Sequence, residues 1–272
     1  MLRSKEVVKK LENKLKKLHR NPNHIKYLYK YYLGFTDRDY INNNRLSVWQ
    51  YLLLHIAVLR LITGANIFHI VGSTVSYGNT LKVTKHTLIP RRETEELIDK
   101  TIKLMKKYQI KPRHIIDLGT GCGVIAISLS KVFKKSRVTA IDISSRALRV
   151  ARYNNRFNQT KVKFKKKSII DQTLSNFDVI ISNPPYLTKC DAIDPEVLRT
   201  EPHQALFAKN QGLYHYQVIL NRAGNFKLIA FEIGANHGAY LTKLARQKFP
   251  GSNIVLEQDF NDQDRYLFII NV

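Results

Sequence analysis

The sequence is poor in cysteine and in long apolar runs, and both shortages narrow the class of protein. Two cysteines, Cys122 and Cys190, occur in 272 residues, and they form no CxxC pair. This excludes a disulfide scaffold, gives no indication of a zinc or other metal site, and favours a reducing, cytoplasmic compartment. The longest apolar stretch, residues 48–62, includes Gln50 and His55. It is too short and too polar to span a bilayer, so we expect a buried helix there.

Acidic residues are also scarce: 21 Asp and Glu stand against 45 Lys and Arg, a formal net charge of +24. Such a charge attracts polyanions, but lysine spread through the whole chain would produce the same total without any such partner. Basic side chains are dense in residues 1–30, where Val7, Leu11 and Leu15 recur at helical spacing. This predicts an amphipathic helix with a solvated lysine face, and it fits neither a transit peptide nor a secretory signal.

The apolar period changes along the chain and divides it into three parts. The pattern of the first part predicts helices, and the last of these helices is capped by Ser47 and ends near Gly64. The second part has a shorter apolar period, which is typical of a strand pair. We therefore predict a helical N-terminal domain over 1–66, a β-hairpin linker over 67–84 and a larger domain over 85–272. The expected helices are residues 4–19, 25–32, 47–61 and, opened by Pro90, a helix to about residue 108.

After Pro112 short apolar strands alternate with helical segments. Strands that alternate with helices at this spacing indicate an α/β fold, in which crossover helices cover both faces of a doubly wound, mostly parallel sheet. The expected strands are residues 115–118, 138–143, 162–164, 177–182, 227–232, 253–256 and 266–270.

A glycine-rich turn, DLGTGCG at residues 117–123, follows the first of these strands. Glycines at alternate positions let the backbone turn sharply and approach a ligand closely. Asp142 ends the next strand, where a carboxylate can accept both hydroxyls of a ribose. A tight strand–helix connection with a surface aspartate is the plainer interpretation. Together, the two features resemble the S-adenosylmethionine site of a class I methyltransferase.

The tetrapeptide Asn183–Tyr186, NPPY, ends the fourth expected strand, at the same sheet edge as the glycine turn. Two prolines keep the backbone extended and remove two donors, so carbonyls and the Asn183 side-chain oxygen can accept the two N–H groups of a planar NH2. That grip would orient an unreactive nitrogen and stabilise its growing positive charge during methyl transfer. Tyr186 could pack on the planar group. A proline stop after a buried strand remains the plainer alternative.

Several further segments resemble the HemK/PrmC family, the glutamine N(5)-methyltransferases of peptide chain release factors. Residues 88–97, LIPRRETEEL, look like the LIPRPETE segment of that family. Glu201-Pro202 with Ala205-Leu206 is similar to its EPxxAL stretch. The other matching positions are Gly72, Tyr77-Gly78 and Val83 upstream, and Gly212-Leu213, Tyr216, Glu232-Ile233-Gly234 and Asp264-Arg265 downstream.

The resemblance implies a class I S-adenosylmethionine-dependent methyltransferase with a seven-stranded, Rossmann-like sheet. It implies methylation of the glutamine in the Gly-Gly-Gln motif of a release factor, with the N-terminal helices docking that partner. The cofactor would lie against Gly119, Thr120, Gly121, Cys122, Gly123, Asp142, Ser168 and Asn183. The catalytic and substrate-binding residues would be Asn183, Pro184, Pro185 and Tyr186.

The chain departs from the family pattern at two places. Arg92 stands where the family has proline in Arg-Pro-Glu, which changes a turn residue. Ser168 stands where the family usually has an acidic residue near the adenine, and Ile169 follows it. We expect Ser168 to accept one hydrogen bond and Ile169 to cover the adenine face. For Arg91 and the acids after it, a salt-bridged helix start is an alternative to a place over the cofactor cleft.

Two other functions fit parts of the pattern. A nucleic-acid methyltransferase acting on adenine or cytosine amines shares the NPPY chemistry and would use the positive charge, although base flipping needs a substantial recognition surface. A non-catalytic binding protein that kept the fold is a second alternative, and the intact NPPY element argues against it.

Overall fold

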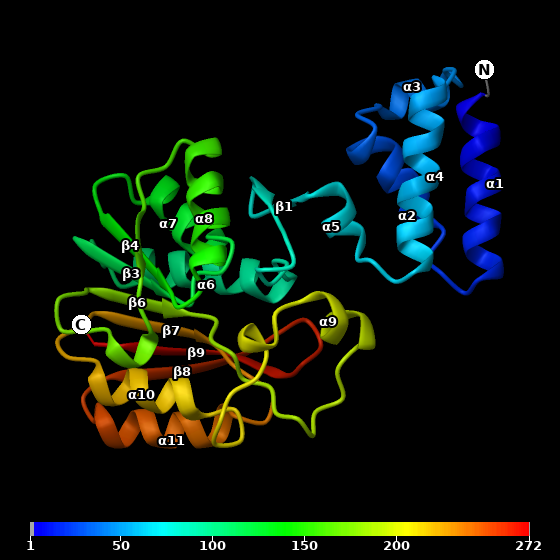
Figure 1. Ribbon diagram of the computed structural model, residues 1–272. Coiled ribbons are helices and arrows are strands. Elements are labelled where there is room, and N and C mark those ends of the chain that lie inside the picture. The colour runs from blue at the N-terminus through cyan, green and yellow to red at the C-terminus, as the bar shows by residue number, and fades with distance from the viewer. Residues whose placement is uncertain (1–2, 272) are drawn as a thin grey trace. The chain divides into compact units, whose positions relative to one another are not determined.

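Residues 3–271 are described by the computed structural model, and they fall into two compact units. Unit 1 runs to Ser73 and includes the distant segment Asp194–Thr200. Unit 2 comprises Thr74–Ile193 and Glu201–Val272. The predicted hairpin linker therefore belongs to unit 2 from Thr74 onward, and each unit is described by itself below (Figure 1).

Unit 1 is helical, as the apolar period predicts. Val7, Leu11 and Leu15 of the first helix are buried against the other helices, while its lysines remain exposed. The helices are α1 (Ser4–Lys17), α2 (Asn23–Tyr27), the π-turn η1 (Leu28–Tyr32), α3 (Asp37–Ile41), α4 (Val48–Ile62), α5 (Ile67–Val71) and α9 (Pro195–Thr200). Of these, α3 and α9 were not predicted, although Thr36 and Asp39 form a capping box at the start of α3.

Two expectations for unit 1 were wrong. Residues 67–71 form the helix α5 rather than part of a strand pair, because Asn66 caps the Phe68 amide at 2.8 Å and Gly72, with φ +79°, ends the helix. The helix α4 begins at the predicted Ser47 cap, but it is not buried all round. Leu54, Ala57, Val58 and Leu61 are buried, whereas Trp49 and several apolar neighbours are exposed.

Helix α9, far away in the sequence, is bound to this unit by two hydrogen bonds. The Asn66 side chain donates to Glu196 at 2.7 Å, and the Arg199 guanidinium donates to the Gly64 carbonyl at 2.8 Å. The guanidinium lies so close to Gly64 that a side chain there would collide with it. The helical unit is thus completed by a segment that the chain supplies after NPPY.

Unit 2 is a three-layer α/β structure whose sheet has the order β5-β4-β3-β6-β7-β9-β8. The strands β3 to β7 pair in parallel, and β9 is antiparallel to both β7 and β8. This confirms the predicted mostly parallel, doubly wound sheet. The strands are β3 (His114–Leu118), β4 (Arg137–Asp142), β5 (Lys163–Lys166), β6 (Val179–Ser182), β7 (Leu228–Glu232), β8 (Asn253–Gln258) and β9 (Asp264–Ile270).

Successive strand residues point to opposite faces, and each face has its own core. On β3, Ile115 packs with α6 and α7, whereas Ile116 packs with α10 and α11. Figure 1 shows α7 and α8 on one side of the sheet and α10 and α11 on the other. The helices are α6 (Arg92–Lys107), α7 (Val124–Val132), α8 (Ser145–Phe157), α10 (Tyr214–Arg222) and α11 (Gly238–Lys248), with 3-10 turns η2 (Ile169–Asp171) and η3 (His203–Ala205).

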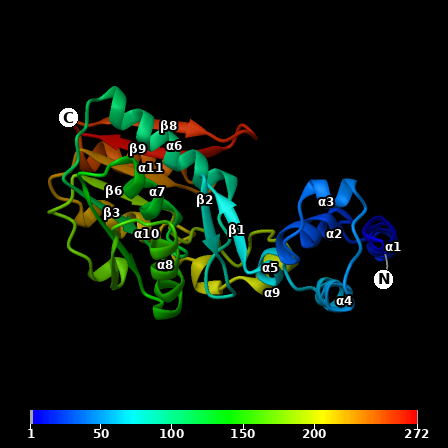
Figure 2. The ribbon, with the colours of Figure 1, turned by 90° about the horizontal axis from the view of Figure 1, so that it is seen from above.

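A small hairpin is formed by β1 (Ser73–Ser76) and β2 (Asn79–Lys82). Its strand β2 packs against the helices α7 and α8 (Figure 2). The buried Asn154 of α8 replaces a strand neighbour for Lys82: its side chain accepts from the Lys82 amide at 2.7 Å and donates to the Lys82 carbonyl at 3.0 Å. Asn79 donates to Ser128 of α7 at 2.9 Å. These bonds attach the hairpin to unit 2.

The strand register places four residues in one row. Leu118, Ile141, Ser182 and Phe231 are aligned across β3, β4, β6 and β7. Because these strands are parallel, the residue after each of them reaches the same sheet edge. Those residues are Gly119, Asp142, Asn183 and Glu232.

Candidate active site

The glycine turn after β3 is built from left-handed backbone. Gly119, Gly121 and Gly123 have φ angles of +76°, +54° and +92°, which side chains rarely allow. A Cβ atom at Gly123 would also lie 3.3 Å from the Ala151 Cβ of α8, whereas one at Gly121 would meet nothing within 4 Å. Gly123 therefore lets the turn pack closely against α7 and α8, and Gly121 faces open space.

The amides of this turn are already used within the protein. Those of Gly119 and Thr120 both donate to the Ile141 carbonyl, at 3.0 and 2.9 Å, and that of Gly121 donates to Asp142 Oδ2 at 2.9 Å. The turn therefore offers a ligand a backbone surface free of side chains rather than a set of free amides.

Asp142 is fixed from two directions. Its Oδ2 accepts from Gly121, and its Oδ1 accepts from the Ser144 amide at 2.8 Å. Burial raises the pKa of Asp142, while these two amides oppose the rise. Each carboxylate oxygen retains a second lone pair, so both can still accept a hydroxyl.

Two other groups in the turn are buried. Thr120 Oγ1 donates to Asp117 Oδ2 at 2.6 Å, and burial raises the pKa of Asp117 to about 7. Burial likewise raises the pKa of the Cys122 thiol to about 12. Since the thiolate is the reactive form, Cys122 is not suited to act as a nucleophile.

A pocket opens beside this turn, and the structure brings most of the predicted site residues to it. Gly119, Thr120, Gly121, Cys122, Asp142, Ser168, Asn183 and Pro185 line it, and Gly123, Pro184 and Tyr186 are not among its lining residues. Its empty volume, counted to the open mouth, is about 990 Å³.

The wall beyond β5 is made by Ser168 and Ile169, which both line the pocket as predicted. The Ser168 hydroxyl accepts from the Ile170 amide at 3.4 Å, and Ile169 Cδ1 would lie 3.8 Å from a Cβ atom on Gly119. An apolar side chain thus lies beside Gly119 in the wall of the pocket.

Asn183 is held by its nitrogen. The Asn183 Nδ2 donates to Thr94 Oγ1 at 3.0 Å, and Thr94 Oγ1 donates to Glu232 Oε2 at 2.8 Å. Thr94 lies in the first turn of α6 and lines the pocket as well. Among residues 3–271 no donor is recorded on Asn183 Oδ1, which remains available as an acceptor.

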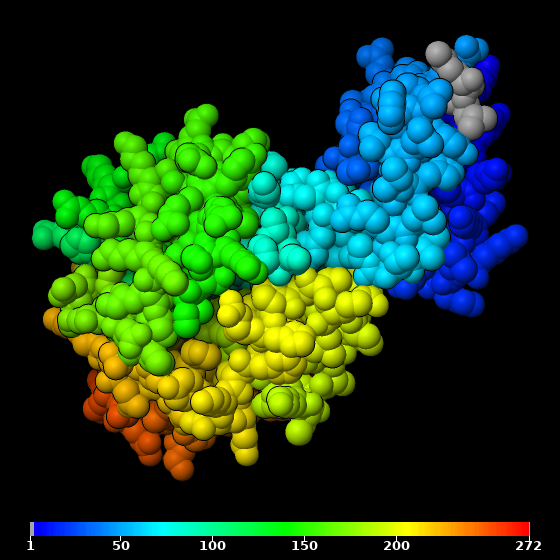
Figure 3. All heavy atoms as spheres, in the orientation of Figure 1, coloured from blue at the N-terminus to red at the C-terminus, as the bar shows by residue number. Residues whose placement is uncertain are grey.

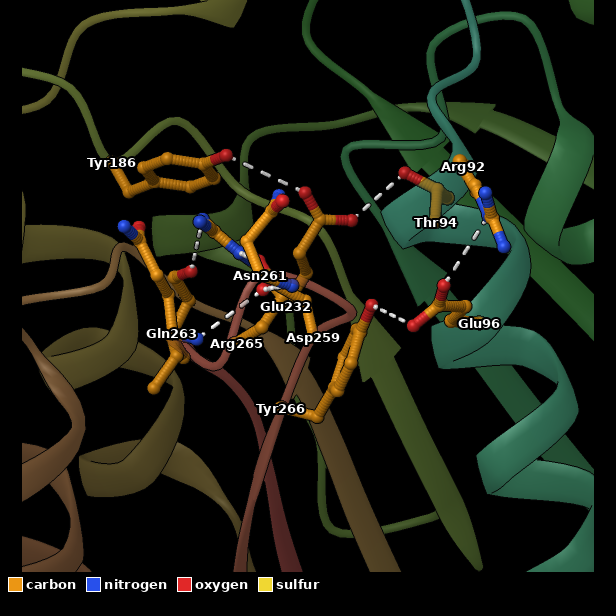
Figure 4. A network of polar contacts seen from close by, with 11 residues as sticks. Arg92, Thr94, Glu96, Tyr186, Glu232, Asp259, Asn261, Gln263, Arg265 and Tyr266 are labelled. Atoms are coloured by element: carbon orange, nitrogen blue, oxygen red, sulfur yellow. Dashed lines mark hydrogen bonds and ion pairs between the residues drawn. The ribbon is translucent and has the colours of Figure 1, made fainter.

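Glu232 is buried at the end of β7, and two hydroxyls reach it from opposite sides (Figure 4). Thr94 donates to one oxygen, and the Tyr186 hydroxyl donates to the other at 3.5 Å. Burial raises the pKa of Glu232 to about 7, against the hydrogen bond from Thr94 and the positive charge of Arg265. Tyr186 therefore has its hydroxyl directed at a buried acid, in addition to any contact that its ring makes with a substrate.

The segment before α6 also lines the pocket, through Leu88 and Pro90. Arg91, the last residue before this helix, pairs with the buried Glu201, whose other oxygen accepts from the Ile89 amide at 3.2 Å. The ion pair that the sequence indicated is therefore long-range, and it holds the segment at the rim. Arg92 pairs with Glu96, 3.6 Å away along the helix, and its guanidinium lies over the Phe260 ring, 4.7 Å from the centroid.

Sequence reasoning missed Thr94 and Glu232 as site residues, and also the pocket-lining His86 and His215. A signal for Glu232 existed: it is an acid that ends an apolar strand, as Asp142 is. Burial lowers the pKa of His215. In the described part of the chain no group of three or more His, Cys, Asp or Glu side chains could hold a metal ion. Nor is any helix of residues 3–271 long and apolar enough to cross a membrane.

Comparison with known proteins agrees with this geometry. A family model described as "Methyltransferase small domain" matches residues 95–205. A release factor glutamine methyltransferase of Lactococcus lactis subsp. lactis is 37% identical over 207 residues, which cover 74% of this chain and 76% of the relative. One from Flavobacterium psychrophilum is 36% identical over 237 residues, 84% of this chain and 81% of the relative.

Solved structures with much lower identity share the fold. The hMettl16 catalytic domain, solved with an RNA hairpin, superposes with a TM-score of 0.54 at 14% identity, covering 81% of this chain and 84% of that one. A T. thermophilus 16S rRNA methyltransferase, solved with AdoMet and guanosine, gives a TM-score of 0.51 at 13% identity, covering 74% of this chain and 50% of that one. The two structures identify the fold as that of class I methyltransferases.

Proposed function

This chain belongs to the release factor glutamine methyltransferase family, and we propose that it methylates the glutamine of the Gly-Gly-Gln motif in peptide chain release factors. The methyl donor is S-adenosylmethionine. The products are N(5)-methylglutamine and S-adenosylhomocysteine.

One observation supports this function above the others: the Asn183 carboxamide stands at the pocket with its nitrogen engaged and its oxygen available. An acceptor oxygen at that place suits a substrate that brings N–H groups. A glutamine side chain brings two of them on a flat nitrogen. The Asn183 oxygen and the Pro184 carbonyl would each accept one.

When bound, S-adenosylmethionine supplies a methyl group on a positively charged sulfur, which keeps the bonding electron pair as the amide nitrogen takes the methyl. Asn183 and the Pro184 carbonyl orient that nitrogen and stabilise its growing positive charge. The methylated nitrogen is acidic and releases one proton to solvent. The site accordingly needs no strong base.

The residues beside the glycine turn fit a nucleoside cofactor. Gly121 leaves open space where a side chain would stand, and Asp142 keeps one lone pair on each oxygen for ribose hydroxyls. Ile169, next to Gly119 in the pocket wall, offers an apolar surface for a flat base, and Ser168 lines the same wall.

The direct test is mass spectrometry of a purified release factor after incubation with this protein and S-adenosylmethionine. We expect the mass of one CH2 group to be added to the peptide that contains Gly-Gly-Gln. A release factor with that glutamine replaced by alanine is the control and should gain nothing. Methyl transfer to RNA or DNA but not to the release factor would contradict the proposal.

The distribution of charge argues for a protein substrate. A groove lined by seven basic side chains and by no Asp or Glu lies at the amino-terminal ends of β3, β4 and β5, where Arg137 and Lys163 begin their strands. The candidate site lies at the carboxyl-terminal ends of the same strands. This basic groove is therefore not beside the place where a flipped base would enter.

Unit 1 offers a surface for docking the partner protein. Its helix α4 exposes an apolar stripe at helical spacing: Val48, Trp49, Leu52, Leu53, Ile56 and Leu59. In Figure 3 the light-blue surface of this helix lies uncovered at the front of unit 1. Exposed apolar residues gathered on one helix face are typical of interaction sites.

Trp49 allows this docking to be measured, because it is the only tryptophan in the chain and is 76% exposed. We expect its fluorescence to shift to shorter wavelength when a release factor binds, and Trp49→Ala to raise the KM for the release factor while kcat changes little. Exchange of the equally exposed Ile41 for alanine, outside the stripe, is the control. An unchanged KM in Trp49→Ala would exclude this face.

A further inference from the structure

A chain of three side chains leads from the pocket to a buried acid. Asn183 donates to Thr94, and Thr94 donates to Glu232, although the three residues come from the end of β6, the start of α6 and the end of β7. Thr94 and Glu232 are both buried. Two long-range hydrogen bonds in a buried place indicate a specific arrangement rather than a surface accident.

We infer that Thr94 and Glu232 are positioning residues, which determine that the Asn183 carboxamide presents its oxygen, and not its NH2 group, to the acceptor nitrogen. The inference rests on the proposed role of Asn183. Thr94 and Glu232 would act on the acceptor nitrogen through Asn183, because the hydroxyl of Thr94 and the carboxylate of Glu232 are bonded to each other.

The direction of the chain follows from the donors that each group has. An ionised Glu232 can only accept, so the hydroxyl proton of Thr94 is committed to it. Thr94 Oγ1 then has only lone pairs left for Asn183 and can bind its NH2 group but not its oxygen. The NH2 group is thereby kept on the Thr94 side, and the oxygen is kept for the substrate. A carboxamide turned by half a turn would present donors to an NH2 group, which cannot accept them.

The surroundings of Glu232 determine when it is ionised. Arg265 of β9 is the positive charge that faces it, and Glu93 of α6 is a negative one. Three tyrosines also surround it, namely Tyr186, Tyr216 of α10 and Tyr266 of β9. Arg265 is itself paired with Asp259 at 2.9 Å and donates to the Ile233 carbonyl, so its charge is shared (Figure 4).

Protonation of Glu232 removes the constraint. Burial raises the pKa of Glu232 to about 7, and the protonated carboxyl can donate to Thr94, which can then donate in turn to the Asn183 oxygen. Both orientations of the carboxamide become possible. We therefore expect methyl transfer to decline as the pH falls through this range.

The first test uses no substrate and no cofactor. In protein labelled with ¹⁵N-asparagine, the Asn183 side-chain NH2 signals, identified by their loss in Asn183→Asp, should shift as the pH is lowered through about 7 in the wild type. They should not shift in Glu232→Gln. If the wild-type signals are insensitive to pH, the hydrogen-bonded chain does not control Asn183, whatever the protein methylates.

The second test compares variants at Thr94. Thr94→Val keeps the shape and loses the hydroxyl, so kcat should fall by about 10–100-fold, the usual effect of losing a supporting hydrogen bond behind a functional group. Thr94→Ser should restore most of the loss. Thr101→Val is the matched control, because Thr101 is buried on the same helix and donates only within it, to the Leu97 carbonyl at 2.6 Å.

The third test is the pH profile of kcat. The decline at low pH should be present in the wild type and absent in Glu232→Gln, which cannot titrate. If the decline of kcat at low pH persists in Glu232→Gln, another group causes the decline and the inference is wrong. The inference is also wrong if Thr94→Val has the kcat of the wild type. A wild type that transfers no methyl group contradicts the proposed function instead, and the NMR titration then still decides on the positioning chain.

Discussion

The two sides of the pocket are built on different principles. The side formed by the glycine turn is held mostly by backbone: the Gly119 and Thr120 amides are bonded to the Ile141 carbonyl, and the Gly121 amide is bonded to the Asp142 carboxylate. The side formed by NPPY is held by side chains, through Asn183, Thr94 and Glu232. The Ile141 carbonyl cannot titrate, so the backbone of Gly119 and Thr120 keeps its bonds when the pH changes. The orientation of Asn183 depends on two side chains, one of which is a buried acid, and this makes the acceptor side the more sensitive one to substitution.

The largest expected effect lies on the acceptor side. Asn183→Ala should bind S-adenosylmethionine normally but lose about 10²–10³ in kcat, the usual effect of removing one preorganised polar group. Calorimetry measures the binding, and methyl transfer to the release factor measures the rate. Asn176→Ala, an exposed asparagine in the loop before β6, is the control. Normal turnover of a folded Asn183→Ala protein would remove the distinction between the two sides.

Two glycine variants separate structure from binding on the cofactor side. Gly123→Ala combines a φ of +92° with crowding against Ile127 and Ala151, so it should destabilise the protein by about 1–3 kcal/mol in urea unfolding. Gly121→Ala meets no neighbouring atom, so its stability loss should stay near the roughly 1–2 kcal/mol of a left-handed residue. Cofactor affinity should fall clearly in Gly121→Ala. The comparison is wrong if Gly121→Ala binds S-adenosylmethionine as the wild type does.

The last expected effect is a dependence of stability on pH. The folded pKa of Glu232 is about 7 against an ordinary 4.5, so the folded protein holds a proton that the unfolded chain has lost. The stability that Glu232 contributes is full below the ordinary value and is lost as the pH rises through about 7. Glu232→Gln should therefore gain stability relative to the wild type as the pH rises from about 4.5 to about 7, and the gain should stay constant above that range. Asp171→Asn, at an exposed carboxyl, is the control, and an equal pH dependence of wild type and Glu232→Gln would argue against a buried, titrating acid.

Local patterns were enough to predict much of the molecule. The strand–helix alternation predicted all seven strands of the sheet, and the Ser47 cap predicted the start of α4. The glycine turn and Asp142 could be placed at one edge because parallel strands end together. Each of these features depends on residues that are close in the sequence or on a general rule of sheet topology.

The missed features depend on distant residues. Thr94 is 89 residues from Asn183 and 138 from Glu232 in the sequence. Nothing near Thr94 distinguishes it from an ordinary helix residue. The same holds for α9, whose contacts with Asn66 and Gly64 span 130 and 135 residues. Long-range pairs of this kind require the fold itself before they can be seen.

The two outermost strands of the sheet have a further consequence, for the behaviour of the protein at high concentration. An unpaired strand edge can join the edge of another molecule and start aggregation. The edge strand β5 exposes Lys163, Lys165 and Lys166, and at the other edge β8 has an irregular register between Glu257 and Gln258. Repulsion between lysines and a bent edge both oppose such joining. The basic composition thus protects the open sheet from association with its own copies.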